Sequence, residues 1–394
     1  MTDFDWPHAQ GACGTYYGGV RLPNGSSRGK SSRPFGATNK REEVGLRTEK
    51  LTFVVGTGRC GSTALSAVVN LHPDVLSLNE LFASVTDPAV LAEAPLSGAE
   101  FWGYLSRPNP ASDSMIRNGA PPSEFLYNRH PEWRYSAETT GIPAISMMVL
   151  PHLTDDPDGL LDALEPEVSS WPTRPVSLQW QALFATLGER FGTTGAVVER
   201  SGLSLGKVAQ LRALFPQARF VHLHRDGPDC ALSMSRHIAF RMLPMLWEMA
   251  QRCGLESPHQ LTPEHAAQLP PDLAPLLTGA YDPALILDRP IPLAVFGDMW
   301  SRWIVDGVRN LGELPADIRT SLSYEHLLTE PRKELTRLAE FIGVEAHADW
   351  LDSASALLDG DGRRGSALKL PPEELEALRV ACAEGTEALA GRGL

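Results

Sequence analysis

The apolar residues of this chain fall into two patterns. Short continuous apolar runs have the length of strands that are buried on both faces. The predicted strands cover residues 51–55, 74–78, 196–198, 218–224 and 319–323, and a run over 144–150 also has the composition of a strand. Apolar positions at helical spacing predict helices over 65–72, 176–191, 205–215, 294–311, 331–342 and 371–389. Because strands and helices alternate, we expect an α/β fold with a parallel sheet flanked by helices.

Three segments lack this regular pattern. Residues 1–48 are rich in Gly, Ser, Pro and Arg, which predicts a flexible N-terminal arm before a single domain over 49–394. Residues 95–143 are weakly periodic and are expected to form loops over a ligand. Residues 236–292 predict a helical insertion rich in Met and Trp. Its side chains form either an adaptable apolar binding surface or the core of a small helical subdomain.

A glycine-rich loop follows the first strand. Gly56, Gly58 and Gly61 tolerate positive φ and let the backbone approach a ligand closely. A strand, a glycine loop and a helix N-terminus together present backbone N–H groups that suit a phosphate. Gly56 and Gly61 have the spacing of a P-loop, but Ser62 stands where that loop has its lysine. Arg59 supplies a cation inside the loop instead. An ordinary β–α turn is the alternative for this loop taken alone.

Arg225 and Ser233 form a second candidate anion site. Arg225 comes directly after the strand 218–224, and Ser233 lies eight residues later, about two turns into a helix that Asp226 opens. A guanidinium group and a hydroxyl can both bind one phosphate near the positive end of a helix.

Two further charged residues follow predicted strands. Glu80 comes after the strand 74–78, and Arg200 comes after the strand 196–198. Open α/β sheets bind their ligands at the carboxyl ends of the strands, so Glu80 is a candidate site residue. A surface or helix-capping glutamate is the alternative.

Composition excludes several other classes. A formal net charge of −13 weighs against nucleic acid as a partner. No apolar run has the length of a membrane span and no signal-peptide pattern is present, so we expect a cytoplasmic protein. Cys60 lies at the mouth of the glycine loop, where the pKa of a thiol could fall; a small loop residue is the alternative. The cysteines are scattered without a CxxC pair, which argues against a disulfide framework or a structural zinc site; they are Cys13, Cys60, Cys230, Cys253 and Cys382.

Taken together, these motifs resemble the sulfotransferases of the bacterial, carbohydrate and tyrosylprotein types, which use 3′-phosphoadenosine 5′-phosphosulfate (PAPS). The 5′-phosphosulfate loop of that family is matched by Gly58, Arg59, Cys60, Gly61, Ser62 and Thr63. Its 3′-phosphate site is matched by Arg225 and Ser233. The resemblance implies a P-loop-type sheet, with helical and loop insertions that cover the acceptor side.

The resemblance also implies roles for further residues. Glu80 matches the family's general base, and Arg200 is the nearest match to a catalytic Lys at its strand end. Tyr324 matches a tyrosine beside the adenine. A basic-glycine loop near the C-terminus offers candidate 3′-phosphate contacts at Arg363, Arg364 and Gly365.

The implied reaction is in-line transfer of a sulfuryl group from PAPS to the hydroxyl or amine of a small-molecule acceptor. No metal is expected, because a sulfuryl group carries less negative charge than a terminal phosphoryl group. Two rivals stay open: a P-loop kinase or NTPase with Asp226 as its magnesium ligand, and a non-catalytic nucleotide-binding protein. Neither the acceptor nor the oligomeric state follows from the sequence.

Overall fold

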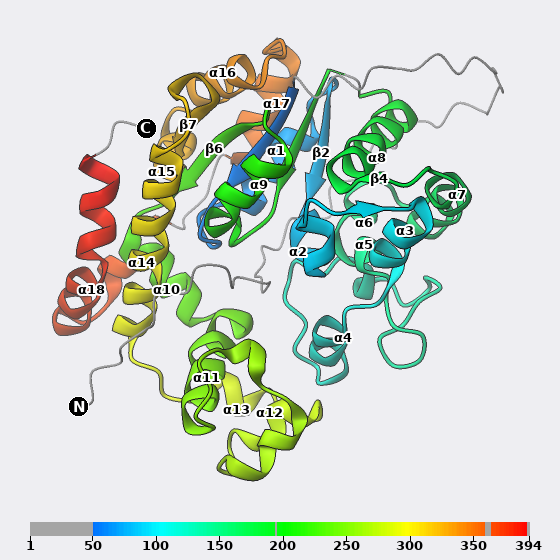
Figure 1. Cartoon of the computed structure of the whole chain (residues 1–394). Helices are drawn as coiled ribbons and strands as arrows, with labels where there is room; N and C mark the ends of the chain where they lie inside the picture. The colour runs from blue at the N-terminus through cyan, green and yellow to red at the C-terminus, as the bar shows by residue number, and fades with distance from the viewer. Residues whose placement is uncertain (1–49, 194, 359–363, 392–394) are drawn as a thin grey trace.

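A five-stranded parallel sheet forms the centre of the computed structural model, which describes residues 50–193, 195–358 and 364–391 (Figure 1). The strand order is β2-β5-β1-β6-β7, with β1 in the middle. The strands are β1 (Leu51–Val55), β2 (Val75–Asn79), β5 (Ala196–Arg200), β6 (Arg219–His224) and β7 (Arg319–Ser323). Two short strands, β3 (Pro95–Leu96) and β4 (Arg174–Pro175), form a separate antiparallel pair.

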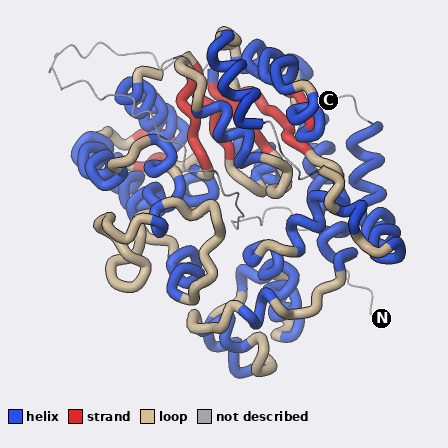
Figure 2. Tube along the Cα trace, turned by 180° about the vertical axis from the view of Figure 1, so that it is seen from behind, coloured by secondary structure: helices blue, strands red, loops and turns tan. Residues whose placement is uncertain are grey.

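Helices cover both faces of the sheet (Figure 2). Alternate residues of β1 belong to two separate apolar clusters, as the period of two in a strand requires. Phe53 and Val55 pack with α8 (Val176–Phe191), α9 (Val208–Leu214) and α14 (Leu293–Gly312). Val54 packs on the other face, with α1 (Ser62–Asn70), α16 (Pro331–Ile342) and α17 (Ala348–Leu358). This three-layer arrangement buries every residue of β1.

Two helical groups extend beyond the sheet. Beside its β2 edge lie α2 (Leu81–Ser84), α3 (Gly98–Ser106), α4 (Pro110–Arg117), α5 (Ala144–Met148), α6 (Leu150–Leu153) and α7 (Pro157–Ser169) (Figure 1). Below the carboxyl ends of the strands in that view lie α10 (Gly227–Ser235), α11 (Ile238–Arg252), α12 (Ala274–Thr278) and α13 (Ala284–Leu287). Met242, Met245 and Met249 of α11 are buried in a cluster with Leu273 and Ile286, so these methionines do not form an exposed apolar surface. The remaining helices are α15 (Tyr324–Thr329) and α18 (Pro372–Gly391).

The predicted α/β class and the strands and helices of the sheet are confirmed, with ends that differ by at most three residues. The strand predicted over 144–150 is wrong, because these residues form α5 and the start of α6. All five residues of α5 are buried, so its apolar run carries no period that separates a helix from a strand. Pro143 starts this helix, and its carbonyl oxygen accepts hydrogen bonds from the N–H groups of Ser146 and Met147.

The predicted arm over residues 1–48 and the candidate Arg363 lie outside the described residues. Within the described part of the chain, no helix has both the length and the apolar character needed to cross a membrane.

Phe53 offers a test of the sheet core. Its ring is fully buried and lies 5.4 Å from the ring of Phe215 and 5.6 Å from that of Phe220, centroid to centroid. We expect Phe53→Ala to lower the free energy of unfolding by about 3–5 kcal/mol, because the lost side chain leaves a cavity. Urea denaturation followed by tryptophan fluorescence measures this change. Leu357→Ala, at an exposed leucine of α17, is the control and should cost less than about 0.5 kcal/mol; equal losses would contradict the assignment of the core.

Candidate functional site

All five strands of the main sheet end at the same edge, and a candidate residue follows or ends each one. The strand order fixes their arrangement: Glu80 after β2 and Arg200 at the end of β5 lie on one side of the glycine loop after β1. Arg225 after β6 and Tyr324 after β7 lie on its other side. Ligands of open parallel sheets bind at this edge.

The glycine loop has the backbone geometry of an anion cradle. Gly58 (φ 72°), Arg59 (φ 58°) and Gly61 (φ 89°) all have left-handed backbone conformations, and Gly61 is the N-cap of the nine-residue helix α1. A Cβ atom on Gly61 would lie 2.0 Å from Cδ2 of Tyr324, and one on Gly58 would lie 2.7 Å from Cζ of Phe240. The loop therefore packs between two aromatic rings and presents backbone N–H groups at a helix N-terminus.

Strained backbone is concentrated at this edge of the sheet. Arg59, Glu80 and Leu203 are the non-glycine residues with positive φ in the described part of the chain, with values of 58°, 58° and 52°. Each follows the carboxyl end of a strand: β1, β2 or β5. A left-handed conformation costs a residue with a side chain roughly 1–2 kcal/mol. Three such residues around one loop favour a functional site.

The two predicted anion sites meet. Nε of Arg59 donates to Oγ of Ser233 at 3.0 Å, and Nη1 of Arg225 donates to the backbone oxygen of Arg59 at 3.3 Å. The Arg225 guanidinium also lies 5.3 Å from the centre of the Tyr324 ring, a cation–π distance. Thus four of the predicted residues form one connected group: Arg59, Arg225 and Tyr324, which follow β1, β6 and β7, and Ser233 of α10.

A carboxylate that the sequence analysis missed brings the C-terminal segment to this group. Oδ2 of Asp229 lies 3.5 Å from Nη2 of Arg225 and accepts the N–H of Gly365 at 2.8 Å. Oδ1 accepts the N–H of Ala367, also at 2.8 Å. The predicted residue Gly365 therefore lies beside Arg225, and Arg364 next to it is exposed. The available signal was an acid in the first turn of the helix after Arg225.

Glu80 and Arg200 form a buried ion pair. Nη1 of Arg200 contacts Oε1 of Glu80, and its Nη2 donates to the side-chain oxygen of Asn79. Oε2 of Glu80 accepts the N–H of Gly202 at 2.8 Å. Glu80 is fully buried and Arg200 is 3% exposed. Both oxygens of the candidate base therefore already have donors within the protein.

The structure adds Glu124, a second carboxylate that the sequence analysis did not single out. Oε1 of Glu124 lies 3.6 Å from Nη1 of Arg59, and its side chain is only 3% exposed. Burial, together with the charge of Glu80, raises the pKa of Glu124 to about 7, although Arg59 acts in the opposite direction. Glu124 lies in the weakly periodic segment 95–143, where the sequence pattern gives no cue.

His237 also lies near Arg59. Burial and the charge of Arg59 lower the pKa of His237 well below its usual value, so its ring is neutral. Its ring meets that of Phe240 edge-on, at 5.5 Å between centroids. The residue follows α10 and precedes α11, and no motif in the sequence marked it.

Cys60 does not have the environment of a reactive thiol. It is 1% exposed, and burial raises the pKa of its thiol, contrary to the fall considered from its place in the loop. Its Sγ lies under Gly56, where an added Cβ would come within 2.7 Å. Cys60 is thus a small packed residue of the loop, as the alternative interpretation stated.

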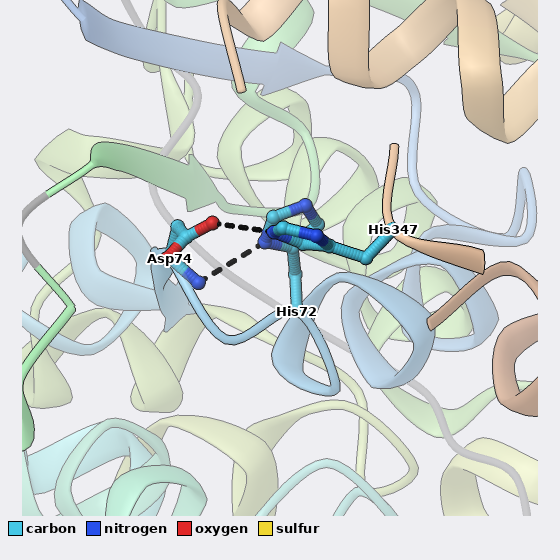
Figure 3. Close-up of side chains that lie close together, drawn as sticks. All are labelled: His72, Asp74 and His347. Atoms are coloured by element: carbon cyan, nitrogen blue, oxygen red, sulfur yellow. Dashed lines mark hydrogen bonds and ion pairs between the residues drawn. The ribbon is translucent and has the colours of Figure 1, made fainter. Parts of the chain in front are cut away.

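His72, Asp74 and His347 form a cluster that could be mistaken for a metal site (Figure 3). Asp74 precedes β2, which places the cluster at the opposite edge of the sheet from the glycine loop. Nδ1 of His72 accepts the N–H of Asp74 at 3.1 Å, and Nε2 contacts the backbone oxygen of Glu345 at 2.9 Å. Nε2 of His347 contacts Oδ2 of Asp74 at 2.8 Å. Both ring nitrogens of His72 therefore have protein partners. The contacts of the cluster connect the turn before β2 to the segment between α16 and α17.

Comparisons with known proteins give one match to a family model, described as "Sulfotransferase family", over residues 52–260, which is more than half of the chain. No curated protein matches the sequence. Among solved structures, the sulfotransferase domain of the Synechococcus PCC 7002 olefin synthase is 16% identical, with a TM-score of 0.41 over 86% of this chain and 94% of that one. A sulfotransferase from Alicyclobacillus acidocaldarius is 15% identical, with a TM-score of 0.36 over 88% and 96%. Since these scores lie below 0.5, the family assignment rests on the family model.

Gly61 tests the geometry of the loop. We expect Gly61→Ala to destabilise the protein by about 2–4 kcal/mol, because the new Cβ overlaps the Tyr324 ring and the residue has φ 89°. Thermal or urea unfolding measures the loss. Gly206→Ala is the matched control: no atom lies within 4 Å of its added Cβ, so the change should stay within about 0.5 kcal/mol. A neutral Gly61→Ala would show that the loop does not pack against Tyr324.

Proposed function

Because the chain belongs to the sulfotransferase family, we propose that it transfers the sulfuryl group of PAPS to a hydroxyl or amine of a small-molecule acceptor. The observation that carries this proposal is the contact between the two anion-binding groups, the glycine loop with Arg59 and the pair Arg225–Ser233. PAPS has anionic groups at both its 5′ and 3′ positions. Two adjoining anion sites at one sheet edge match that charge distribution.

The residues of the cradle fit the 5′ end of this donor. The backbone N–H groups from Gly58 to Thr63 and the hydroxyls of Ser62 and Thr63 would hold the 5′-phosphate, at the partly positive N-terminus of α1. Gly61 keeps this surface open, because a side chain there would collide with Tyr324. Cys60 would contribute through its backbone, since its side chain is buried.

A second set of residues would hold the other end of the donor. Arg225 and Ser233 would bind the 3′-phosphate, with Arg364 and Gly365 from the C-terminal segment that Asp229 fixes. Tyr324 would lie beside the adenine. In the structure its ring is 2% exposed and packs on Gly61.

Bound PAPS would supply an activated sulfuryl group with a phosphate leaving group. The guanidinium of Arg59 and the loop N–H groups would stabilise the negative charge that develops on the leaving 5′-phosphate oxygen. Glu80 would accept the proton of the acceptor, and Arg200 would hold the Glu80 carboxylate in place through their ion pair. To act in this way, the fully buried carboxylate of Glu80 must become accessible to the acceptor through a lone pair that Arg200 and Gly202 leave open.

A sulfate-transfer screen tests the activity. We expect the full-length protein to transfer labelled sulfate from PAPS to a member of a panel of sugars, lipids, phenols, peptides and amines, detected as a mass increase. Parallel reactions with ATP and Mg²⁺ cover the kinase or NTPase rival. Turnover of ATP without turnover of PAPS would favour that rival. Binding of 3′,5′-ADP without any transfer would favour the non-catalytic rival.

The acceptor found in this screen allows a test of Glu80. We expect Glu80→Gln to lower kcat by roughly 10²–10⁴-fold, because Gln cannot accept a proton, while 3′,5′-ADP still binds. Steady-state kinetics and calorimetry measure the two effects. The variant leaves Arg200 with an unpaired buried charge, so a second variant with Glu80→Gln and Arg200→Gln removes both charges; it should also bind 3′,5′-ADP without transfer. An unchanged kcat in either folded variant would rule out Glu80 as the base.

A further inference from the structure

Glu124 is held rigidly although it lies in a loop. The loop connects α4 to a 3₁₀ turn over Tyr127–Arg129, and the next residue, Phe125, is 3% exposed in an apolar cluster. The N–H of Leu126 donates to the backbone oxygen of Met147 in α5 at 3.1 Å. Tyr127 is fully buried, and its hydroxyl contacts Asp158 of α7. These anchors fix the backbone that directs Glu124 toward Arg59.

The two oxygens of Glu124 differ in their partners. Oε1 lies 3.6 Å from Nη1 of Arg59, whereas Oε2 is buried without a hydrogen-bond partner. A buried polar atom without a partner is uncommon and costs free energy. Arg59, in turn, uses Nε for Ser233. Glu124 therefore faces Arg59 with one oxygen, while its other oxygen is buried without a hydrogen-bond partner.

The charges around Glu124 come from three strand ends. Arg59 after β1 favours its ionised form most strongly, and Arg200 at the end of β5 does so less. Glu80 after β2 acts in the opposite direction. His237 faces Arg59 from the start of α11 and is neutral, so it adds no charge. The protonation of Glu124 thus depends on how strongly the charge of Arg59 acts on its carboxylate.

We propose that Glu124 is the counter-ion of Arg59 in the free protein, and that it takes up a proton when the anionic end of the donor binds Arg59. Since this role rests on the proposed donor, the ligand class is a nucleotide with a 5′-phosphate or 5′-phosphosulfate. The bound anion pairs with Arg59 in place of Glu124, and it adds negative charge next to this buried carboxylate. Protonation removes this repulsion and turns Oε2 into an O–H donor that can bind an oxygen of the ligand.

The sign of the pH dependence follows from this exchange. Free Glu124 has a pKa of about 7, and bound anion raises that pKa further. Binding is therefore strongest below pH 7, where Glu124 is already protonated, and weakens as the pH rises above 7. The dissociation constant should increase by up to about tenfold per pH unit over this range. Glu124→Gln imitates the protonated form and should not show this increase.

Calorimetry with 3′,5′-ADP tests the proposal on the full-length protein. Titrations at pH 8 in two buffers of different ionisation enthalpy give the number of protons taken up on binding. The phosphates of the ligand have second pKa values of about 6 and are already fully ionised at that pH, so they do not contribute to the proton uptake. We expect an uptake approaching one proton for the wild type and none for Glu124→Gln. Glu138→Gln, at an exposed glutamate of the same segment, is the matched control and should behave like the wild type.

The dissociation constants give an independent readout. Wild type and Glu124→Gln should bind 3′,5′-ADP equally at pH 6, and the variant should bind about tenfold more tightly at pH 8. A merely structural role would instead weaken binding at both pH values.

Equal proton uptake by the two proteins, or weaker binding by the variant at both pH values, would overturn the assignment of Glu124. If the variant does not fold, an absence of proton uptake by the wild type at pH 8 overturns it as well. Failure of the wild type to bind 3′,5′-ADP at any pH would refute the proposed function itself, which is a separate outcome.

Discussion

Three arginines at one edge of the sheet each have an acidic partner, and the rest of the site depends on this pairing. Arg59 faces Glu124, Arg200 faces Glu80, and Arg225 faces Asp229. The three arginines end or follow β5, β1 and β6, and their acidic partners lie after β2, in α10 and in the loop after α4. A buried charge without a partner is costly, and removing one member of such a pair typically costs about 3–5 kcal/mol. The pairs therefore fix how the loops after the strands sit against one another.

These pairs also connect parts of the chain that the sequence presents as separate. Glu124 comes from the segment before α5 and pairs with the glycine loop, so the loops expected to cover the acceptor contact the proposed donor site directly. Asp229 does the same for the C-terminal segment through its hydrogen bond with Gly365. The proposed donor and acceptor sides of the site are thus joined by the charged pair of Arg59 and Glu124.

Much of this arrangement could be predicted from the sequence, because strand ends in a parallel sheet share one edge. The apolar runs located β1, β2, β5, β6 and β7, and the residues that follow them met as expected at that edge. Arg225 and Ser233, which their spacing marked as a pair, both contact Arg59 in the structure. The pattern failed over 144–150, where full burial removes the period that distinguishes a helix from a strand. Glu124 and Asp229 were missed because their importance lies in contacts across long sequence separations, which no local pattern encodes.

The hydrogen bonds between Asp229 and the C-terminal segment have a consequence for how the sequence of this chain can vary. Both of its hydrogen bonds to the C-terminal segment end on backbone N–H groups, those of Gly365 and Ala367. The position of these two residues is therefore set in part by a carboxylate more than a hundred positions earlier, and the side chain of Arg364 is exposed. Substitutions at that exposed position should leave both of these hydrogen bonds intact, whereas loss of the carboxylate at position 229 would remove them whatever the sequence of the segment.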